Sequence, residues 1–273
     1  MRTLILLITI GFIRINTFCQ TYSELVDSAK FYIESENNLR AEYLLKKIIF
    51  TFPNDPNKYI MYNNLGTVQR RLGNYNEAFN SYDLGIKLNK KDMMLYQNRG
   101  TLKKYLKDYN GAIKDLNKAI KLDPNEEQNY IERAGAKRNI GDIEGARADF
   151  EKILTINPKS YKALGSLANL SKAEGKMDEA LKMYNEVILM YPNEHSLYNN
   201  RADFYMQIEE FEKALTDINK SIELDSDYEI AYVTKGEILL KLNKIEEACE
   251  YFYKAIEKGF SKDRLKEYLE KCQ

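Results

Sequence analysis

The sequence predicts an all-α fold, an α-solenoid of stacked two-helix hairpins with a C-terminal capping helix, and three observations support this. Within windows of 34 residues, apolar residues fall at helical spacing in two blocks. Only 13 glycines and 5 prolines occur among 273 residues, which argues against an all-β chain with many tight turns. The strongest observation is that alanine recurs every 34 residues, at Ala78, Ala112, Ala146, Ala180, Ala214 and Ala248.

Three further rows of residues keep the same register. Large residues occupy Tyr62, Tyr96, Tyr130, Leu164, Tyr198 and Tyr232. Small residues occupy Gly66, Gly100, Ala134, Ala168, Ala202 and Gly236. Mostly aromatic residues occupy Tyr82, Leu116, Phe150, Tyr184, Ile218 and Phe252. The register defines six repeats, at 59–92, 93–126, 127–160, 161–194, 195–228 and 229–262.

Each repeat is expected to form two helices joined by a short turn, such as Gly73-Asn74 or Gly141-Asp142. Proline after the second helix, as in Asp123-Pro124, stops it. One hairpin cannot bury its apolar face alone, so neighbouring hairpins must stack on it.

The flanks of the array complete the expected organisation. Residues 20–58 read as a degenerate first repeat that keeps Leu25, Ala29, Ala41 and Leu45, followed by a connector. Residues 263–273 place Leu265, Tyr268 and Leu269 at helical spacing, which predicts the capping helix over the last apolar face.

Residues 1–19 are expected to be a signal peptide, because an apolar run from Leu4 to Ile13 follows Arg2 and is too short to span a membrane. Cleavage before Gln20 would leave an exported chain, periplasmic or secreted, most consistent with a bacterial envelope. Two alternatives stay open: a buried N-terminal helix, and a lipid anchor on Cys19, which the preceding Phe18 disfavours. No second apolar stretch is long enough to span a membrane.

The composition argues against an enzyme and against nucleic-acid binding. The 41 basic residues balance the 41 acidic ones, so nothing attracts a polyanion over the whole chain. A single histidine, His195, excludes histidine metal clusters, and no nucleophile has an activating partner. We therefore expect no catalytic residues, no cofactor and no metal. Cys249 and Cys272 are compatible either with a disulfide or with ordinary buried thiols.

Numbering each repeat from 1 to 34 reveals a linked substitution. Position 7 is arginine at Arg99, Arg133 and Arg201, and position 23 of the same repeats is Asp115, Asp149 and Asp217. The other repeats have no acid at position 23. We predict that each arginine pairs with the aspartate of its own repeat, because a partly buried charge requires a partner.

The period, the residue rows and segments such as YNNLGTVQRRLGNYNEAFNSYDLGIKLN resemble the tetratricopeptide repeat (TPR) family over about 240 of the 273 residues. The resemblance implies a non-enzymatic scaffold that docks a peptide, helix or subunit of a partner protein in a concave groove. The alternative is a structural subunit of a cell-envelope assembly that packs through its convex face and ends.

By this resemblance, positions 2, 5, 6, 9, 12 and 13 of each first helix line the groove. Side-chain amides there would pair with a peptide backbone, and cations would attract acidic segments. The partner-binding candidates are Asn63, Asn64, Arg70, Asn98, Lys104, Arg138, Lys172, Asn200, Asp203 and Glu237. The alternative interpretation of these residues is a solvated helix face, with cations that offset the helix dipole.

Overall fold

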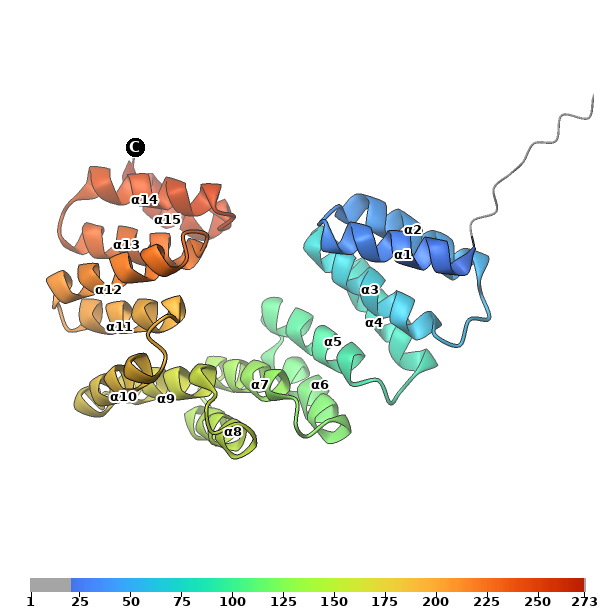
Figure 1. The fold of residues 1–273 in the computed structure, drawn as a ribbon, viewed down its shortest axis with the longest axis horizontal. Helices are drawn as coiled ribbons and strands as arrows, with labels where there is room; N and C mark the ends of the chain where they lie inside the picture. Colours follow the sequence, from blue (N-terminus) through green and yellow to red (C-terminus); the bar gives the residue numbers. More distant parts are fainter. Residues whose placement is uncertain (1–20, 273) are drawn as a thin grey trace, which may run out of the picture. The chain divides into compact units, whose positions relative to one another are not determined.

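The computed structural model describes residues 21–272, and all regular elements of this part of the chain are helices (Figure 1). The predicted signal peptide, residues 1–19, lies outside the described residues. The chain divides into two compact units, residues 1–102 and 103–273, which are described separately here.

Unit 1 contains two complete helical hairpins and most of a fifth helix. In each hairpin the two helices pack on one another, and the second helix of the first hairpin also packs on the next hairpin. The helices are α1 (Tyr22–Glu34), α2 (Asn38–Thr51), α3 (Lys58–Arg71), α4 (Tyr75–Leu88) and α5 (Met93–Tyr105), which continues into unit 2.

Unit 2 repeats the same hairpin four times after α6 and ends in short helical segments. The long helices are α6 (Tyr109–Leu122), α7 (Glu127–Asn139), α8 (Ile143–Ile156), α9 (Tyr161–Ala173), α10 (Met177–Met190), α11 (His195–Gln207), α12 (Phe211–Leu224), α13 (Glu229–Lys241) and α14 (Ile245–Glu257). Each second helix packs on the first helix of the following hairpin, for example α8 on α9 and α12 on α13.

Position 15 of every repeat has a positive φ, which ends the first helix and reverses the chain. Gly73, Gly141 and Gly175 adopt this conformation at φ of 80°, 81° and 79°. Lys107 and Glu209 adopt it at 64° and 62° despite their Cβ atoms. The turns predicted from sequence are therefore confirmed, and glycine is preferred there because it alone pays no steric cost.

The rows of small and large residues form the contact between the two helices of a hairpin. Ala78 and Tyr82 are fully buried, and a Cβ added to Gly66 would lie 2.6 Å from the Tyr82 ring. A Cβ on Gly236 would likewise meet the Phe252 ring at 2.5 Å. The small row thus provides space for the aromatic row, and this close approach sets the geometry of the hairpin.

In four repeats, the tyrosine at position 4 fastens the loop that precedes the repeat. The Tyr130 hydroxyl donates to the Pro124 carbonyl at 3.0 Å, and Tyr232 donates to Ser226 at 3.0 Å. The tyrosines that recur at position 4 therefore pack in the core with their rings and anchor the preceding loop with their hydroxyl groups.

The C-terminal cap differs from the single predicted helix. It consists of a 3₁₀ turn (Lys262–Leu265), the one-turn helix α15 (Lys266–Leu269) and a second 3₁₀ turn (Glu270–Cys272). Its apolar residues do cover the last core, because Leu265 and Leu269 are buried and Tyr268 stacks on Phe252 at 4.9 Å. A disulfide joins Cys272 to Cys249 of α14.

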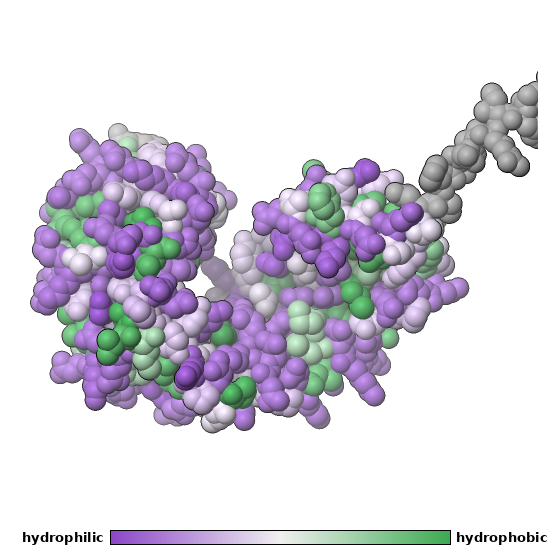
Figure 2. All heavy atoms as spheres, in the orientation of Figure 1, coloured by the Kyte–Doolittle hydropathy of each residue, from purple (hydrophilic) through white to green (hydrophobic). Residues whose placement is uncertain are grey.

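The visible surface is predominantly hydrophilic, with scattered apolar patches (Figure 2). Within residues 21–272, no helix has both the length and the hydropathy needed to cross a bilayer.

Candidate inner-face binding site

We define the inner face as positions 2, 5, 6, 9, 12 and 13 of the first helix in each repeat. In unit 1 it contains a groove between α1 and α3, called here the α1/α3 groove. Its floor is apolar and its margin is polar, so it is suited to an apolar side chain on a polar backbone. The groove is lined by Tyr22, Val26, Ala29, Lys30, Ile33, Glu34, Leu45, Asn57, Ile60, Met61 and Asn64.

Asn64 is the predicted partner-binding residue that lies in this groove. Asn63 and Asn98 contact each other instead, with the Asn98 amide donating to the Asn63 side-chain oxygen at 2.8 Å. The predicted amide row in unit 1 is therefore an interacting pair beside an amide that lines the groove.

Val26 and Ile33 of the degenerate repeat also line the groove and were not among the sequence candidates. They occupy positions 5 and 12, where the next repeat carries the amide of Asn63 and the cation of Arg70. The apolar residues at these positions are visible in the sequence, but none of the predicted partner-binding residues lies in the degenerate repeat.

In unit 2 two cations of the inner face, Lys104 and Lys172, are paired with acids of the following repeat. Lys104 forms an ion pair with Glu132, which also accepts a hydrogen bond from Gln128 at 2.8 Å. Lys172 forms an ion pair with Asp203. Two of the cations predicted to attract acidic segments are thus neutralised, and these pairs also link successive hairpins.

Glu237 is held by the C-terminal cap. The Tyr268 hydroxyl donates to the Glu237 carboxylate at 2.6 Å, and this hydrogen bond followed by burial raises the pKa of Tyr268 to about 12. Burial, together with the charge of Asp203, raises the pKa of the Glu237 carboxyl above its usual value despite the hydrogen bond. The last acid of the inner face is therefore shielded.

The remaining candidates are dispersed. Arg138 is exposed near the end of α7. Arg70 is half-buried near the hydroxyl of Tyr82. Burial raises the pKa of this hydroxyl, and the positive charge of Arg70 offsets part of the increase. Asn200 is half-buried on α11, near Gly165 of α9. These three residues lie in different hairpins.

The predicted arginine–aspartate pairs are confirmed in two repeats. Arg133 Nε donates to Asp149 Oδ2 at 2.9 Å and its Nη2 donates to Oδ1, a bidentate geometry. Arg201 binds Asp217 in the same way, at 2.7 and 2.8 Å. In the repeat 93–126, Arg99 binds Asp83 of the preceding repeat, and the predicted pair with Asp115 stays a prediction.

Two further positions belong to this network and were missed. Position 11 supplies a second partner for position 23, as Lys137 Nζ lies 3.0 Å from Asp149. Position 25 of the preceding repeat accepts a second bond from position 7, as in Arg133 to Asn117 at 2.6 Å and Arg201 to Asn185 at 2.7 Å. The signal was present in the sequence, because an amide precedes both arginines by 16 residues.

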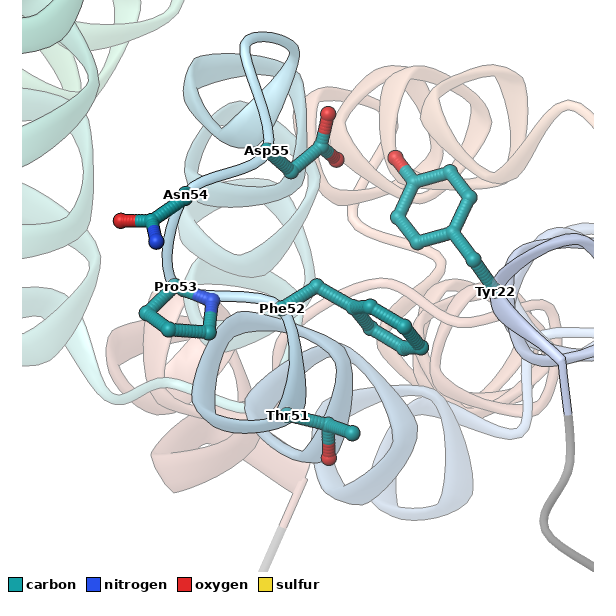
Figure 3. Close-up of a pocket in the computed structure, with 6 residues that line it drawn as sticks. All are labelled: Tyr22, Thr51, Phe52, Pro53, Asn54 and Asp55. Atoms are coloured by element: carbon teal, nitrogen blue, oxygen red, sulfur yellow. The ribbon is translucent and has the colours of Figure 1, made fainter.

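A second, shallow hollow beside the start of α1 is lined by two aromatic rings (Figure 3). The Tyr22 and Phe52 rings meet edge to face at 5.1 Å, and the Asp55 carboxyl points towards the Tyr22 hydroxyl. Burial, with the hydrogen bond to Asp55, raises the pKa of Tyr22 to about 12. These contacts fasten the connector to α1, so we assign them a structural role.

Residues 21–272 contain no group of three histidine, cysteine or acidic side chains that could hold a metal ion. His195 is half-buried, with Nε2 at 3.5 Å from Asp225 and its ring against Tyr228 at 4.4 Å. These contacts lie within its own repeat, against the loop between α12 and α13.

Stacked hairpins with small–aromatic contacts and a polar inner face define a helical-repeat protein. Models of the tetratricopeptide repeat match residues 59–92, 95–126, 139–203, 195–228 and 230–257. The chain therefore belongs to the tetratricopeptide repeat family. Among solved structures, it is similar to a tetratricopeptide repeat protein from Parabacteroides merdae, with 30% identity and a TM-score of 0.79 over 92% of this chain and 98% of that one.

More distant structures share the fold alone. MamA from Desulfovibrio magneticus is 18% identical, with a TM-score of 0.56 over 63% of this chain and 95% of that one. Pseudomonas aeruginosa pilF is 16% identical, with a TM-score of 0.59 over 75% of this chain and 92% of that one. No curated protein matches the chain significantly.

Proposed function

We propose that the protein is a non-enzymatic scaffold that docks a peptide, helix or subunit of a partner protein on its inner face. The observation that carries this proposal is the α1/α3 groove, whose apolar floor adjoins the amide of Asn64. The floor would bury an apolar side chain of the partner, and the amide would both donate to and accept from its backbone.

The charged residues of the inner face are paired more firmly in unit 2 than at the α1/α3 groove of unit 1. Lys30 and Glu34 at the margin of the α1/α3 groove form only a weak ion pair, 3.8 Å apart and largely exposed. In unit 2, Lys104 and Lys172 already have acidic partners. A partner would have to displace those acids, so we assign the primary contact to the α1/α3 groove.

The test is to recover partners with the tagged mature chain from its native cell, identify them by mass spectrometry, and measure affinity with the purified partner. The variant Ile60→Asn/Asn64→Ala removes one apolar and one amide contact of the groove. We expect the affinity to fall by about tenfold or more, corresponding to ~1–2 kcal/mol.

The matched control is Ile230→Asn. Ile230 occupies the same position 2 of its repeat as Ile60, and the two residues are similarly exposed, at 39% and 38%. Affinity should be unchanged in this variant. Equal binding by the groove variant and the unmodified chain would refute the α1/α3 groove as the primary contact.

The alternative function, a structural subunit of a cell-envelope assembly, is favoured by a separate observation. Leu39, Tyr43 and Phe50 of α2 are exposed to 72%, 55% and 86%. Such a patch would pack against another surface without using the inner face.

We further propose that the chain is exported. Its support is the signal-like sequence of residues 1–19 and the disulfide between Cys249 and Cys272, which would persist in an oxidising compartment. Sequencing the N-terminus of the native protein tests this. Gln20 at the start supports export, a lipid-modified Cys19 supports export with an anchor, and an intact Met1 refutes both.

A further inference from the structure

The outer side of α2 differs from that of every later second helix. Leu39, Tyr43 and Phe50 occupy positions 18, 22 and 29, so their spacing of four and seven residues places them on one side of the helix. We call these three residues the α2 stripe. At the same three positions, α4, α6, α8, α10, α12 and α14 carry polar residues except at Ala148 and Leu189.

The α2 stripe is bordered by cations. Arg40 lies over the Tyr43 ring at 5.3 Å, and Lys46 forms an ion pair with Glu42 at 2.7 Å while 59% of its side chain stays exposed. With Lys47, α2 has three basic residues and a single acid. A partner surface should therefore combine apolar residues with an excess of acids.

A shallow apolar crevice lies next to Phe50, between α2 and α3. It is lined by Lys46, Ile49, Phe50, Pro53, Lys58, Tyr62 and Leu65. The crevice reflects a local departure from the repeat pattern. Position 7 is Leu65 and the preceding position 25 is Lys46, whereas a cation bonds an amide at three of the later junctions, as Lys235 bonds Asn219 at 2.6 Å.

The outer side of α14 has the complementary chemistry. Ile245 and Tyr253 are exposed to 49% and 50%. The acids on this helix outnumber its single cation, Lys254, and all four are exposed: Glu246, Glu247, Glu250 and Glu257. Glu247 is 3.5 Å from Lys244 in a solvent-exposed pair, which is weak enough to rearrange on binding.

We propose that the α2 stripe of one copy docks on the outer side of α14 of a second copy. Basic residues of α2 then face acids of α14, and Tyr253 of the second copy fills the crevice beside Phe50. The contact joins two different surfaces, so it is head-to-tail and builds rings or open filaments rather than a closed twofold dimer. It leaves the α1/α3 groove unused and is independent of the proposed scaffold function.

The test is sedimentation velocity of the mature chain, residues 20–273, over a range of concentrations. We expect reversible association that weakens as salt is raised, because salt screens the charges. The variant Leu39→Asn/Tyr43→Asn/Phe50→Lys replaces the stripe with the residues that α4 carries at the same positions, Asn76, Asn80 and Lys87. It should lower the association constant by about tenfold or more.

The matched control is Leu189→Thr, which removes an equally exposed apolar residue, 83% accessible, from position 29 of α10. Its association should equal that of the unmodified chain. Circular dichroism of each variant confirms that helicity is retained. Association unaffected by the stripe variant, or lost in the control, overturns the proposal.

A charge exchange tests the partner surface. Arg40→Glu/Lys46→Glu on α2 and Glu246→Lys/Glu250→Lys on α14 should each abolish association, and a chain carrying all four changes should regain it. A chain that is monomeric at every concentration overturns the proposal. The proposal is also overturned if the unmodified chain does not self-associate but binds phosphatidylglycerol vesicles, and the stripe variant loses this binding. That result would assign the α2 stripe to a lipid surface.

Discussion

Asp149 shows how a single residue holds the two helices of a hairpin together. Its side chain is only 4% exposed, yet it carries a carboxylate that meets Arg133 and Lys137 on α7. A buried carboxylate of this kind is stable because both oxygens have cationic partners, and the same burial makes the loss of one partner costly.

We therefore predict that Asp149→Ala destabilises unit 2 by about 3 kcal/mol, because Arg133 and Lys137 lose their counter-charge in a shielded site. The double variant Arg133→Leu/Asp149→Met copies Leu167 and Met183 of the next repeat and should cost less. Thermal and urea unfolding of both variants measure the difference. An unchanged melting temperature for Asp149→Ala would show that the pair contributes nothing.

At Glu237 we predict a pH-dependent effect. Burial raises the pKa of the Glu237 carboxyl in the folded state. The folded state is therefore destabilised, relative to the unfolded state, as the pH rises above the usual pKa of 4.5 and the carboxyl ionises. Glu237→Gln keeps an acceptor for the Tyr268 hydroxyl but removes this cost. It should raise the melting temperature at pH 7 and have no effect below about pH 4.

The control for this measurement is Glu267→Gln, an exposed acid of the cap next to Tyr268. It should leave the melting temperature unchanged at both pH values. If Glu237→Gln is less stable than the unmodified chain at pH 7, the ionised Glu237 carboxylate stabilises the folded state, which contradicts the prediction.

The residue partners that the sequence analysis identified lie in one repeat. Arg133 and Asp149 vary together at positions 7 and 23, so their pairing followed from the sequence. Asn117 belongs to the preceding repeat, and Lys104 and Glu132 belong to successive repeats. Identifying those contacts requires knowing which helix surfaces face each other after stacking, which the period alone does not specify.

Among the elements, the helices followed the register of the sequence more closely than the cap. The position of α9 follows from Leu167, Ala168 and Leu170, all buried at helical spacing. The cap has only a few residues to bury, and helices this short are marginal on their own. Its path is set instead by contacts at fixed points: the Tyr268 ring on Phe252 and the Cys272 bridge to α14.

The disulfide leads to a prediction about the cap. Cys249 and Cys272 are 23 residues apart, and closing a loop of this size stabilises a fold by about 3 kcal/mol. A dithiol reductant should therefore lower the melting temperature of unit 2. The variant Cys249→Ser/Cys272→Ser should show the lower value without reductant and no further response to it. Identical melting of the oxidised and reduced chains would contradict this.

Within unit 2, each hairpin from α7 to α14 packs mainly on its sequence neighbours, as α8 packs on α7 and α9. Stability in such an array is close to a sum of hairpin and junction terms. A part of the chain should fold alone where its newly exposed end is polar. The first helix of the third repeat provides such an end, because position 3 is the fully buried Asn129, where the neighbouring repeats have Leu95 and Ala163.

We predict that the fragment 127–273 is helical, monomeric and cooperatively folded. Its exposed end would present Asn129, Gln128 and Glu132, and neither side-chain amide atom of Asn129 has a hydrogen-bond partner in the intact chain, so exposure relieves an unsatisfied group. The fragment 195–273 is the matched comparison, since it exposes Leu197 and Phe204. In the intact chain these two residues are only 2% and 1% exposed. Circular dichroism and light scattering should find the first fragment soluble and the second prone to association. If both fragments unfold alike, junction chemistry does not decide where this array can be divided.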